Sequence, residues 1–233
     1  MSNTSVRTVD ADGIRYNPRF TTTPSLSLFD PANEQLNAQP VTQGGRNAAW
    51  FIRHGEHEAV LRHYKRGGLI AKLVRQYYVW MGAERTRSWA EYAVLLHLYN
   101  KGVRVPLPLA AMWQRHFLGY KAAIIVARLP SAFPIAYQLE QSSPQAVALA
   151  IKQMHDAGVW HADLNVFNVL IDAQQHIYLI DFDKAKIVDV VDSKQRQNNL
   201  LRLRRSLIKV RGNEGLLWYE QVAQAYQQLT AQI

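Results

Sequence analysis

The chain has 233 residues, 48% hydrophobic and 19% charged, which is typical of a globular protein and excludes disordered and collagen-like classes. It contains no cysteine, which excludes disulfide scaffolds, thiol nucleophiles and cysteine-ligated metal centres. Its net charge of +9 favours nucleic acid, anionic lipid headgroups or phosphorylated substrates as partners, and it also fits a merely solvated basic surface. No secretory signal is visible in the first twenty residues. The longest apolar run, 122–127, is too short to span a bilayer.

The first elements predicted along the chain are an arm and a hairpin. Residues 1–40 contain four prolines and predict an extended arm with little regular structure. Short β-type runs at 48–53 and 59–64 are joined by the polar residues 55–58, which predicts a β-hairpin.

A helix and a strand are expected next. Apolar residues recur at helical spacing from Thr86 to Lys101, and Gly102 fits the stop. Residues 103–109 hold two prolines and are interpreted as a connector. The apolar run at 120–129 predicts a buried strand.

The last hundred residues predict mostly helix. Pro144 in a first turn and Gly158 at the end delimit one helix, and two further helices finish the chain. Between them, 169–171 and 177–180 predict two short strands about a tight turn. The order predicts an α+β bilobal fold, with a β-rich N-lobe over 41–129 and a mostly helical C-lobe over 130–233.

The stretch from His161 to Asp183 carries the chemistry. Asp163 is expected in a loop, Asn168 at the start of a strand and Asp181 at the end of the paired strand, so the hairpin brings the last two together. Two oxygen ligands beside a further carboxylate suit Mg²⁺, which is completed by waters and substrate phosphates. Asp163, close to the metal but not on it, is placed to accept a proton from an alcohol.

This spacing resembles the H-x-D-x-x-x-x-N and D-F-G pair of the protein-kinase-like superfamily, which transfers phosphoryl groups from ATP. The alternative is that these residues only cap turns. His161 is expected to brace the loop. Asn165 is interpreted as a loop-shaping residue or a hydroxyl contact, and Asp183 as a second metal ligand or a solvent-facing residue.

The N-lobe is expected to complete the ATP site. Gly44 and Gly45 precede a β-run where a loop covering the phosphates belongs, although an ordinary turn is a comparable interpretation. Arg62 stands where the superfamily has Lys, and its planar guanidinium can hold phosphates. Lys65 is the alternative cation. Glu91, on the predicted helix, is the expected ion-pair partner, or else an exposed helix charge.

With these residues in view, the sequence resembles the 3-deoxy-D-manno-octulosonic acid (Kdo) kinases of the lipopolysaccharide kinase family. The segments that carry the resemblance are VLRHYKRGGLIAKL, TRSWAEYAVL, HADLNVFNVLID, LIDFDKAKI and NNLLRLRRSLIK. The resemblance implies ATP-dependent phosphorylation of a Kdo hydroxyl on a Kdo–lipid A precursor, with Asp163 as proton acceptor. It also implies peripheral attachment to the cytoplasmic face of the bacterial inner membrane.

The charge pattern agrees with an anionic, amphiphilic acceptor. Residues 194–211 carry seven cations and no acid, and a second basic cluster at 62–75 runs into aromatic residues at 77–80. Each cation near an anionic surface contributes about 1 kcal/mol of attraction. Residues 194–211 can equally be a solvated helix that packs through its leucines. No nucleic-acid-binding motif is legible, so no nucleic-acid partner is expected.

Two other functions remain open. One is a kinase with another acceptor, either an aminoglycoside-type small molecule or a protein hydroxyl. The residue directly before Asp163 is not Arg, and no A-P-E motif follows Asp181. Both features favour a non-protein acceptor. The other is a non-catalytic pseudokinase that binds lipid or nucleic acid; Asp163, Asn168 and Asp181 together argue against it.

Overall fold

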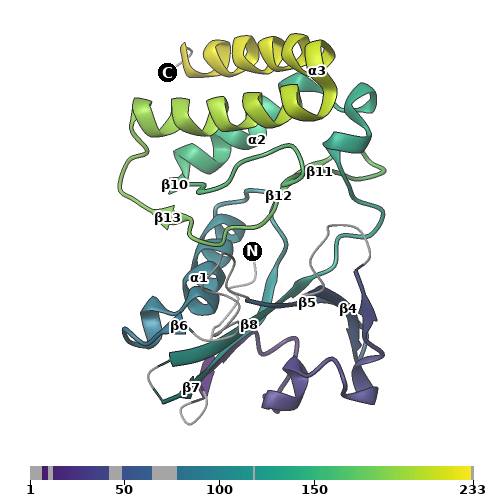
Figure 1. The fold of residues 1–233 in the computed structure, drawn as a ribbon, viewed down its shortest axis with the longest axis vertical. Coiled ribbons are helices and arrows are strands. Elements are labelled where there is room, and N and C mark those ends of the chain that lie inside the picture. The colour runs from purple at the N-terminus through teal and green to yellow at the C-terminus, as the bar shows by residue number, and fades with distance from the viewer. Residues whose placement is uncertain (1–6, 10–12, 42–48, 65–77, 118, 232–233) are drawn as a thin grey trace. The chain divides into compact units, whose positions relative to one another are not determined.

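The computed structural model describes residues 7–9, 13–41, 49–64, 78–117 and 119–231 (Figure 1). Contacts divide the chain into two compact units. The first comprises Met1–Ala93 and Leu107–Arg128, and the second comprises Val94–Pro106 and Leu129–Ile233. The expected loop at Gly44 and Gly45, and the alternative cation Lys65, lie outside the described residues.

The first unit is built on one antiparallel sheet. Its strands follow the order β1-β2-β7-β8-β5-β4-β3, and β6 pairs with β8 at one end. Their bounds are β1 Arg7–Val9, β2 Ile14–Tyr16, β3 Gln39–Pro40, β4 Ala49–His54, β5 His57–His63, β6 Tyr78–Val79, β7 Pro108–His116 and β8 Gly119–Ala127. The α+β class is confirmed, with a β-rich first unit and a largely helical second unit.

The expected hairpin is β4 and β5, joined by a tight turn at Gly55. Strand β7 was not predicted, and the expected connector at 103–109 is wrong where this strand begins. Pro108 is compatible with the first position of a strand, where its missing N–H costs little. The following residues, Leu109–Met112, are buried between neighbouring strands and so lack polar alternation.

Residues 13–40 contain more regular structure than their prolines indicated. Strand β2 pairs with β7, and two short 3-10 helices follow, η1 (Leu26–Phe29) and η2 (Glu34–Leu36). Phe29 and Leu36 are almost fully buried in the core of the first unit. The expectation of little regular structure failed because the apolar residues between the prolines pack into this core.

Helix α1 (Arg87–Asn100) is the helix that the apolar spacing predicted. It follows a short 3-10 helix, η4 (Ala83–Arg85). The first half of α1 is fixed to the sheet of the first unit. Ser88 Oγ donates to the carbonyl of Met112 (2.8 Å), and Trp89 Nε1 donates to the carbonyl of Gly13 (2.9 Å). These bonds set the rotation of the helix, and therefore the position of Glu91 one turn later.

The second unit contains helix α2 (Pro144–Asp156), whose N-terminus is capped by Ser143 as its side chain accepts from the N–H of Ala146. The helix ends before Gly158, which has a φ of 76°. A side chain at this position would meet the carbonyl of Val188, so only glycine fits there. The chain then enters β10 (Val159–Trp160), which pairs with β13 (Lys186–Ile187).

A small sheet and a long helix complete the second unit. Strands β11 (Val169–Ile171) and β12 (Ile177–Leu179) form the expected hairpin, and β9 (Phe133–Pro134) pairs with β11. Two 3-10 helices, η5 (Ile135–Tyr137) and η6 (Leu139–Gln141), precede α2.

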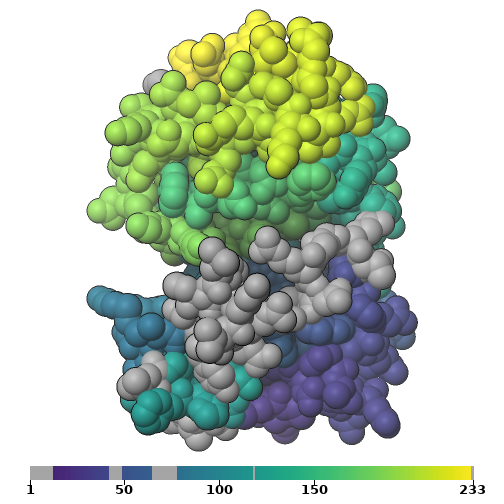
Figure 2. Space-filling view, viewed as in Figure 1, coloured from purple at the N-terminus to yellow at the C-terminus, as the bar shows by residue number. Residues whose placement is uncertain are grey.

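Helix α3 (Ser193–Ala231) contains the two predicted final helices, because Gly212 adopts non-helical dihedral angles (φ 58°, ψ −132°). The chain reverses there, and the two halves of α3 lie side by side (Figure 1). Helix α3 forms much of the visible surface of the second unit (Figure 2). Among the described residues, no helix has the combination of length and hydrophobicity that crossing a membrane requires.

Candidate active site

The loop between β10 and β11 is organised around the buried imidazole of His161. Its Nδ1 accepts the N–H of Asp163 (3.0 Å), which requires the proton of the neutral ring to sit on Nε2. Nε2–H then donates to the carbonyl of Ile180 (3.0 Å). Burial lowers the pKa of His161, which keeps this neutral tautomer. The expected bracing role of His161 therefore has a structural basis.

Asp163 combines a fixed main chain with an accessible carboxylate. Its N–H is bound by His161, and its carbonyl accepts from the side-chain amides of Asn165 (3.0 Å) and Asn168 (2.9 Å). Its side chain is 54% exposed and its Oδ1 accepts from Nη1 of Arg202 at 2.5 Å. A carboxylate in this setting can accept a proton from a bound alcohol without movement of the loop.

Asn168 and Asp181 lie where the hairpin prediction placed them along the chain. Asn168 immediately precedes β11, and its carbonyl accepts the N–H of Ile180 (3.0 Å), so Asp181 follows the residue paired with it. Asp181 has a φ of 62°, so the chain turns sharply at this residue. Because Asn168 Nδ2 donates to Asp163, the amide is fixed, and its Oδ1 accepts no hydrogen bond from the described residues.

These residues fit the chemistry of Mg²⁺. One carboxylate and one amide oxygen are hard ligands, and Mg²⁺ normally retains waters and substrate phosphates for its other positions. A dedicated cage is not required, and no group of three or more His, Asp or Glu suited to a metal is found among the described residues. The expected pair, Asn168 and Asp181, is therefore a compatible but minimal donor set.

A buried network of hydrogen-bonded side chains, which the sequence did not predict, holds the main chain of the loop. The side chain of Asn199, on α3, donates to the carbonyl of His161 (2.6 Å) and accepts its N–H (3.3 Å). The same oxygen of Asn199 lies 3.0 Å from Nε2 of His155, on α2. Because this amide oxygen can only accept, His155 carries its proton on Nε2.

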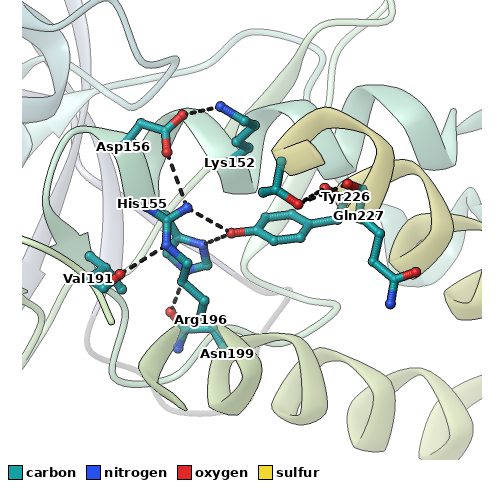
Figure 3. Close-up of polar contacts among 9 residues, drawn as sticks. Lys152, His155, Asp156, Val191, Arg196, Asn199, Tyr226 and Gln227 are labelled. Atoms are coloured by element: carbon teal, nitrogen blue, oxygen red, sulfur yellow. Dashed lines mark hydrogen bonds and ion pairs between the residues drawn. The ribbon is translucent and has the colours of Figure 1, made fainter. Parts of the chain in front are cut away.

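Tyr226, on the second half of α3, completes this network (Figure 3). Its hydroxyl donates to Nδ1 of His155 (2.7 Å) and accepts from Nη1 of Arg196 (3.1 Å). Arg196 also binds Asp156 (3.1 Å), whose other oxygen binds Lys152 (2.5 Å). Burial lowers the pKa of His155 to about 4, which keeps the ring neutral and the direction of every bond defined.

In the first unit, Arg62 and Glu91 form the expected ion pair. Nη2 of Arg62 on β5 donates to both carboxylate oxygens of Glu91 on α1, at 2.9 and 2.8 Å. The Glu91 side chain is only 2% exposed, so it is not the surface charge of the alternative interpretation. The Tyr64 hydroxyl also donates to Glu91, and burial together with this carboxylate raises the pKa of Tyr64 well above its usual value.

The exposed carboxylate of Asp163 lies in a hydrogen-bonded loop, and Asn168 and Asp181 follow around the hairpin. This order of residues is typical of the protein-kinase-like phosphotransferases. The Arg62–Glu91 pair in the β-rich unit is consistent with this class.

The comparisons identify the family. The model of the lipopolysaccharide kinase (Kdo/WaaP) family matches residues 32–231. A protein from Xanthomonas axonopodis pv. citri (strain 306), named 3-deoxy-D-manno-octulosonic acid kinase, is 42% identical over 191 residues, 80% of this chain and 76% of its own. One of the same name from Xylella fastidiosa (strain M23) is 40% identical over 193 residues, 81% and 77% of the two chains. The chain belongs to this family of lipopolysaccharide kinases and is an ATP-dependent phosphotransferase.

Four residues near the loop were not assigned a role at the site from the sequence: His155, Asn199, Arg202 and Tyr226. Arg202 stood out only as part of a basic run without acids. The other three are an ordinary helical His, Asn and Tyr, and no local pattern marks them.

Proposed function

We propose that the protein transfers the γ-phosphoryl group of ATP to a hydroxyl of Kdo on a Kdo–lipid A precursor during lipopolysaccharide core synthesis. The names of the relatives support this acceptor. The observation that carries the catalytic part is Asp163, whose main chain is fixed through three hydrogen bonds while its carboxylate stays half exposed. A positioned base of this kind is what transfer to an alcohol requires.

In the proposed reaction, the acceptor hydroxyl oxygen forms a bond to the γ-phosphorus as the bond to the β–γ bridging oxygen breaks. Asp163 takes the hydroxyl proton, and ADP retains the bridging oxygen. His161 holds the main chain of Asp163 in place but does not touch the reacting atoms. Asn165 donates to the Asp163 carbonyl and accepts the N–H of Phe167 (2.9 Å), which favours its loop-shaping interpretation.

Asn168 and Asp181 are the residues we propose to hold Mg²⁺, which would neutralise charge on the phosphates when bound. The hydrogen bond from Asn168 Nδ2 to the Asp163 carbonyl would hold the amide with its oxygen facing away from that carbonyl. Arg62, oriented by Glu91, is the residue we propose to contact the ATP phosphates from the first unit.

We further propose that the protein acts peripherally at the cytoplasmic face of the inner membrane. Val79, Met81 and Phe117 are 63%, 64% and 83% exposed. Val79 is paired with Gly119, two residues from Phe117 in the turn between β7 and β8, so these two apolar residues lie at the same end of the sheet. Exposed apolar residues on a chain of net charge +9 suit an anionic lipid surface better than nucleic acid, which we do not expect as a partner.

A kinase for a cationic small molecule is the second candidate, and one contact disfavours it. The guanidinium of Arg202 lies on the proposed base, Asp163, and would repel an aminoglycoside-type acceptor. An anionic acceptor is attracted by the same charge.

Mass spectrometry of purified Kdo–lipid A after incubation with ATP, Mg²⁺ and the protein tests the proposal. We expect a gain of one phosphate on the sugar, absent with Asp163→Asn and unchanged with Asp189→Asn, an exposed acid between β13 and α3. ATP turnover without a phosphorylated lipid would exclude this acceptor. No ADP release under any condition would favour the pseudokinase.

A further inference from the structure

Helix α3 presents a cation to the proposed catalytic base from outside the catalytic loop. The loop itself, from His161 to Asn168, contains no Lys or Arg. Arg202 lies one turn before Ser206, whose Oγ accepts the N–H of Val166 (3.0 Å), so this face of α3 runs along the loop. The Arg202 side chain is 45% exposed and its Nη1 reaches Asp163 at 2.5 Å.

The contact with Arg202 is not needed to hold the loop. The main chain of Asp163 is already bound by His161, Asn165 and Asn168, and the main chain of His161 by Asn199. Ion pairs this exposed usually contribute at most about 1 kcal/mol, so a ligand anion can share or replace the pair. A guanidinium has five N–H donors, and one of them accounts for the hydrogen bond that Arg202 makes to the described residues.

An acceptor that carries a carboxylate needs a cation such as Arg202 beside Asp163. Asp163 and Asp181 are both carboxylates, and ATP adds further negative charge, so an anionic acceptor is repelled unless a positive group stands beside the base. Arg is suited to this task because its planar fork binds a carboxylate through two parallel hydrogen bonds. A Kdo sugar carries a carboxylate on the same ring system as its hydroxyls.

From these contacts we infer that Arg202 binds the carboxylate of the sugar-acid acceptor and thereby places its hydroxyl at Asp163. This inference rests on the proposed function, and it names Arg202 as the residue that selects an acidic acceptor. Arg205 and Lys209, exposed on the same side of α3, extend the positive surface away from Asp163.

The test compares two acceptors, Kdo–lipid A and its derivative with the Kdo carboxylate converted to a carboxamide. For the wild type, we expect the KM to be about 10- to 100-fold lower for the acid than for the amide, the range of a charge-assisted hydrogen bond. In Arg202→Gln, the KM for the acid should rise to that for the amide, while the KM for ATP stays the same. Arg202→Lys should recover part of the preference.

Lys101→Gln is the matched control, because it removes the same charge from an exposed position at the end of α1 and should leave the preference for the acid unchanged. Circular dichroism and thermal unfolding of Arg202→Gln check that the variant is folded, and Arg202→Lys serves if it is not. Equal loss with both acceptors, or a raised KM for ATP, would overturn the inference and assign Arg202 to the transferring phosphate. An unchanged preference would also overturn it. If the wild type phosphorylates neither acceptor, the proposed function fails instead.

Discussion

The side chain of Asn199 binds the main chain of His161 at both ends: Nδ2 donates to the carbonyl (2.6 Å) and Oδ1 accepts the N–H (3.3 Å). Asn199 lies on α3 and is 38 residues from His161 in sequence. Because Asp163 is two residues beyond His161, this amide fixes where the proposed base stands.

Replacement of Asn199 by Ala should therefore affect stability and turnover together. It leaves the buried N–H and carbonyl of His161 without partners, which we expect to lower the free energy of unfolding by about 1–3 kcal/mol. We expect kcat to fall at least about tenfold, since a small displacement of a base is costly. Asn198→Ala, exposed on the same turn, should change stability by less than about 0.5 kcal/mol. Equal behaviour of the two variants in urea unfolding and steady-state assays would contradict this role.

The stability of the second unit should depend on pH through His155. Its folded-state pKa of about 4 lies below the ordinary value of 6.5, so the neutral ring stabilises the fold fully above about pH 6.5. That contribution is lost as the pH falls from 6.5 toward 4, by about 1.4 kcal/mol for each unit of pKa difference. Unfolding free energies measured at pH 7, 6 and 5 should fall less steeply in His155→Gln. An NMR titration that places the His155 pKa near 6.5 would refute the prediction.

The buried carboxylate of Glu91 should matter much more than an exposed one. Glu91→Gln removes the negative charge that pairs with Arg62 and replaces one of the two oxygens that accept from Arg62 and Tyr64 with an amide group. We expect a loss of about 3 kcal/mol in the free energy of unfolding, toward the lower end for a broken buried pair because Arg62 keeps some exposure. We also expect a higher KM for ATP.

The matched control for Glu91 is Glu84→Gln, since Glu84 also pairs with an arginine, Arg15 at 2.8 Å, but its side chain is 73% exposed. This control should cost less than about 1 kcal/mol and leave the KM for ATP unchanged. If both variants lose the same stability, the burial of Glu91 does not decide its contribution.

Asp181 should determine how much Mg²⁺ the reaction needs. Asp181→Asn removes the only charged ligand of the proposed pair, so the Mg²⁺ concentration for half-maximal rate should rise about tenfold or more. Asp183→Asn distinguishes the two interpretations of that residue: a rise in the Mg²⁺ requirement indicates a second metal, and no change indicates a solvent-facing acid. Rates measured against total Mg²⁺ at saturating ATP provide the readout. An unaltered Mg²⁺ requirement in Asp181→Asn would remove Asp181 from the metal site.

The arrangement of the proposed catalytic stretch was predictable because its members are local in sequence. His161, Asn168 and Asp181 fall within one loop and one hairpin, and a tight turn leaves few ways to arrange them. The ion pair of Arg62 with Glu91 was also foreseen, although these residues are 29 apart, because the family spacing indicated it.

The remaining contacts depend on tertiary packing that no local pattern encodes. Tyr226 is 71 residues from His155, and Arg202 is 39 from Asp163. Helical periodicity gave the faces of α2 and α3 but not which turn of one meets which turn of the other. Strand β7 escaped notice for a related reason, since its buried first half shows no alternation to distinguish it from a connector.

The reversal of α3 at Gly212 brings Tyr226 back to His155, a residue that is translated much earlier. Tyr226, whose hydroxyl joins His155 to Arg196, lies 71 residues after His155 and is translated later than the loop it supports. A nascent chain in which the second half of α3 has not yet been translated contains the proposed base and the hairpin. It lacks Tyr226, which completes the hydrogen-bond network. The proposed phosphotransfer centre is therefore completed only after the second half of α3 has been translated.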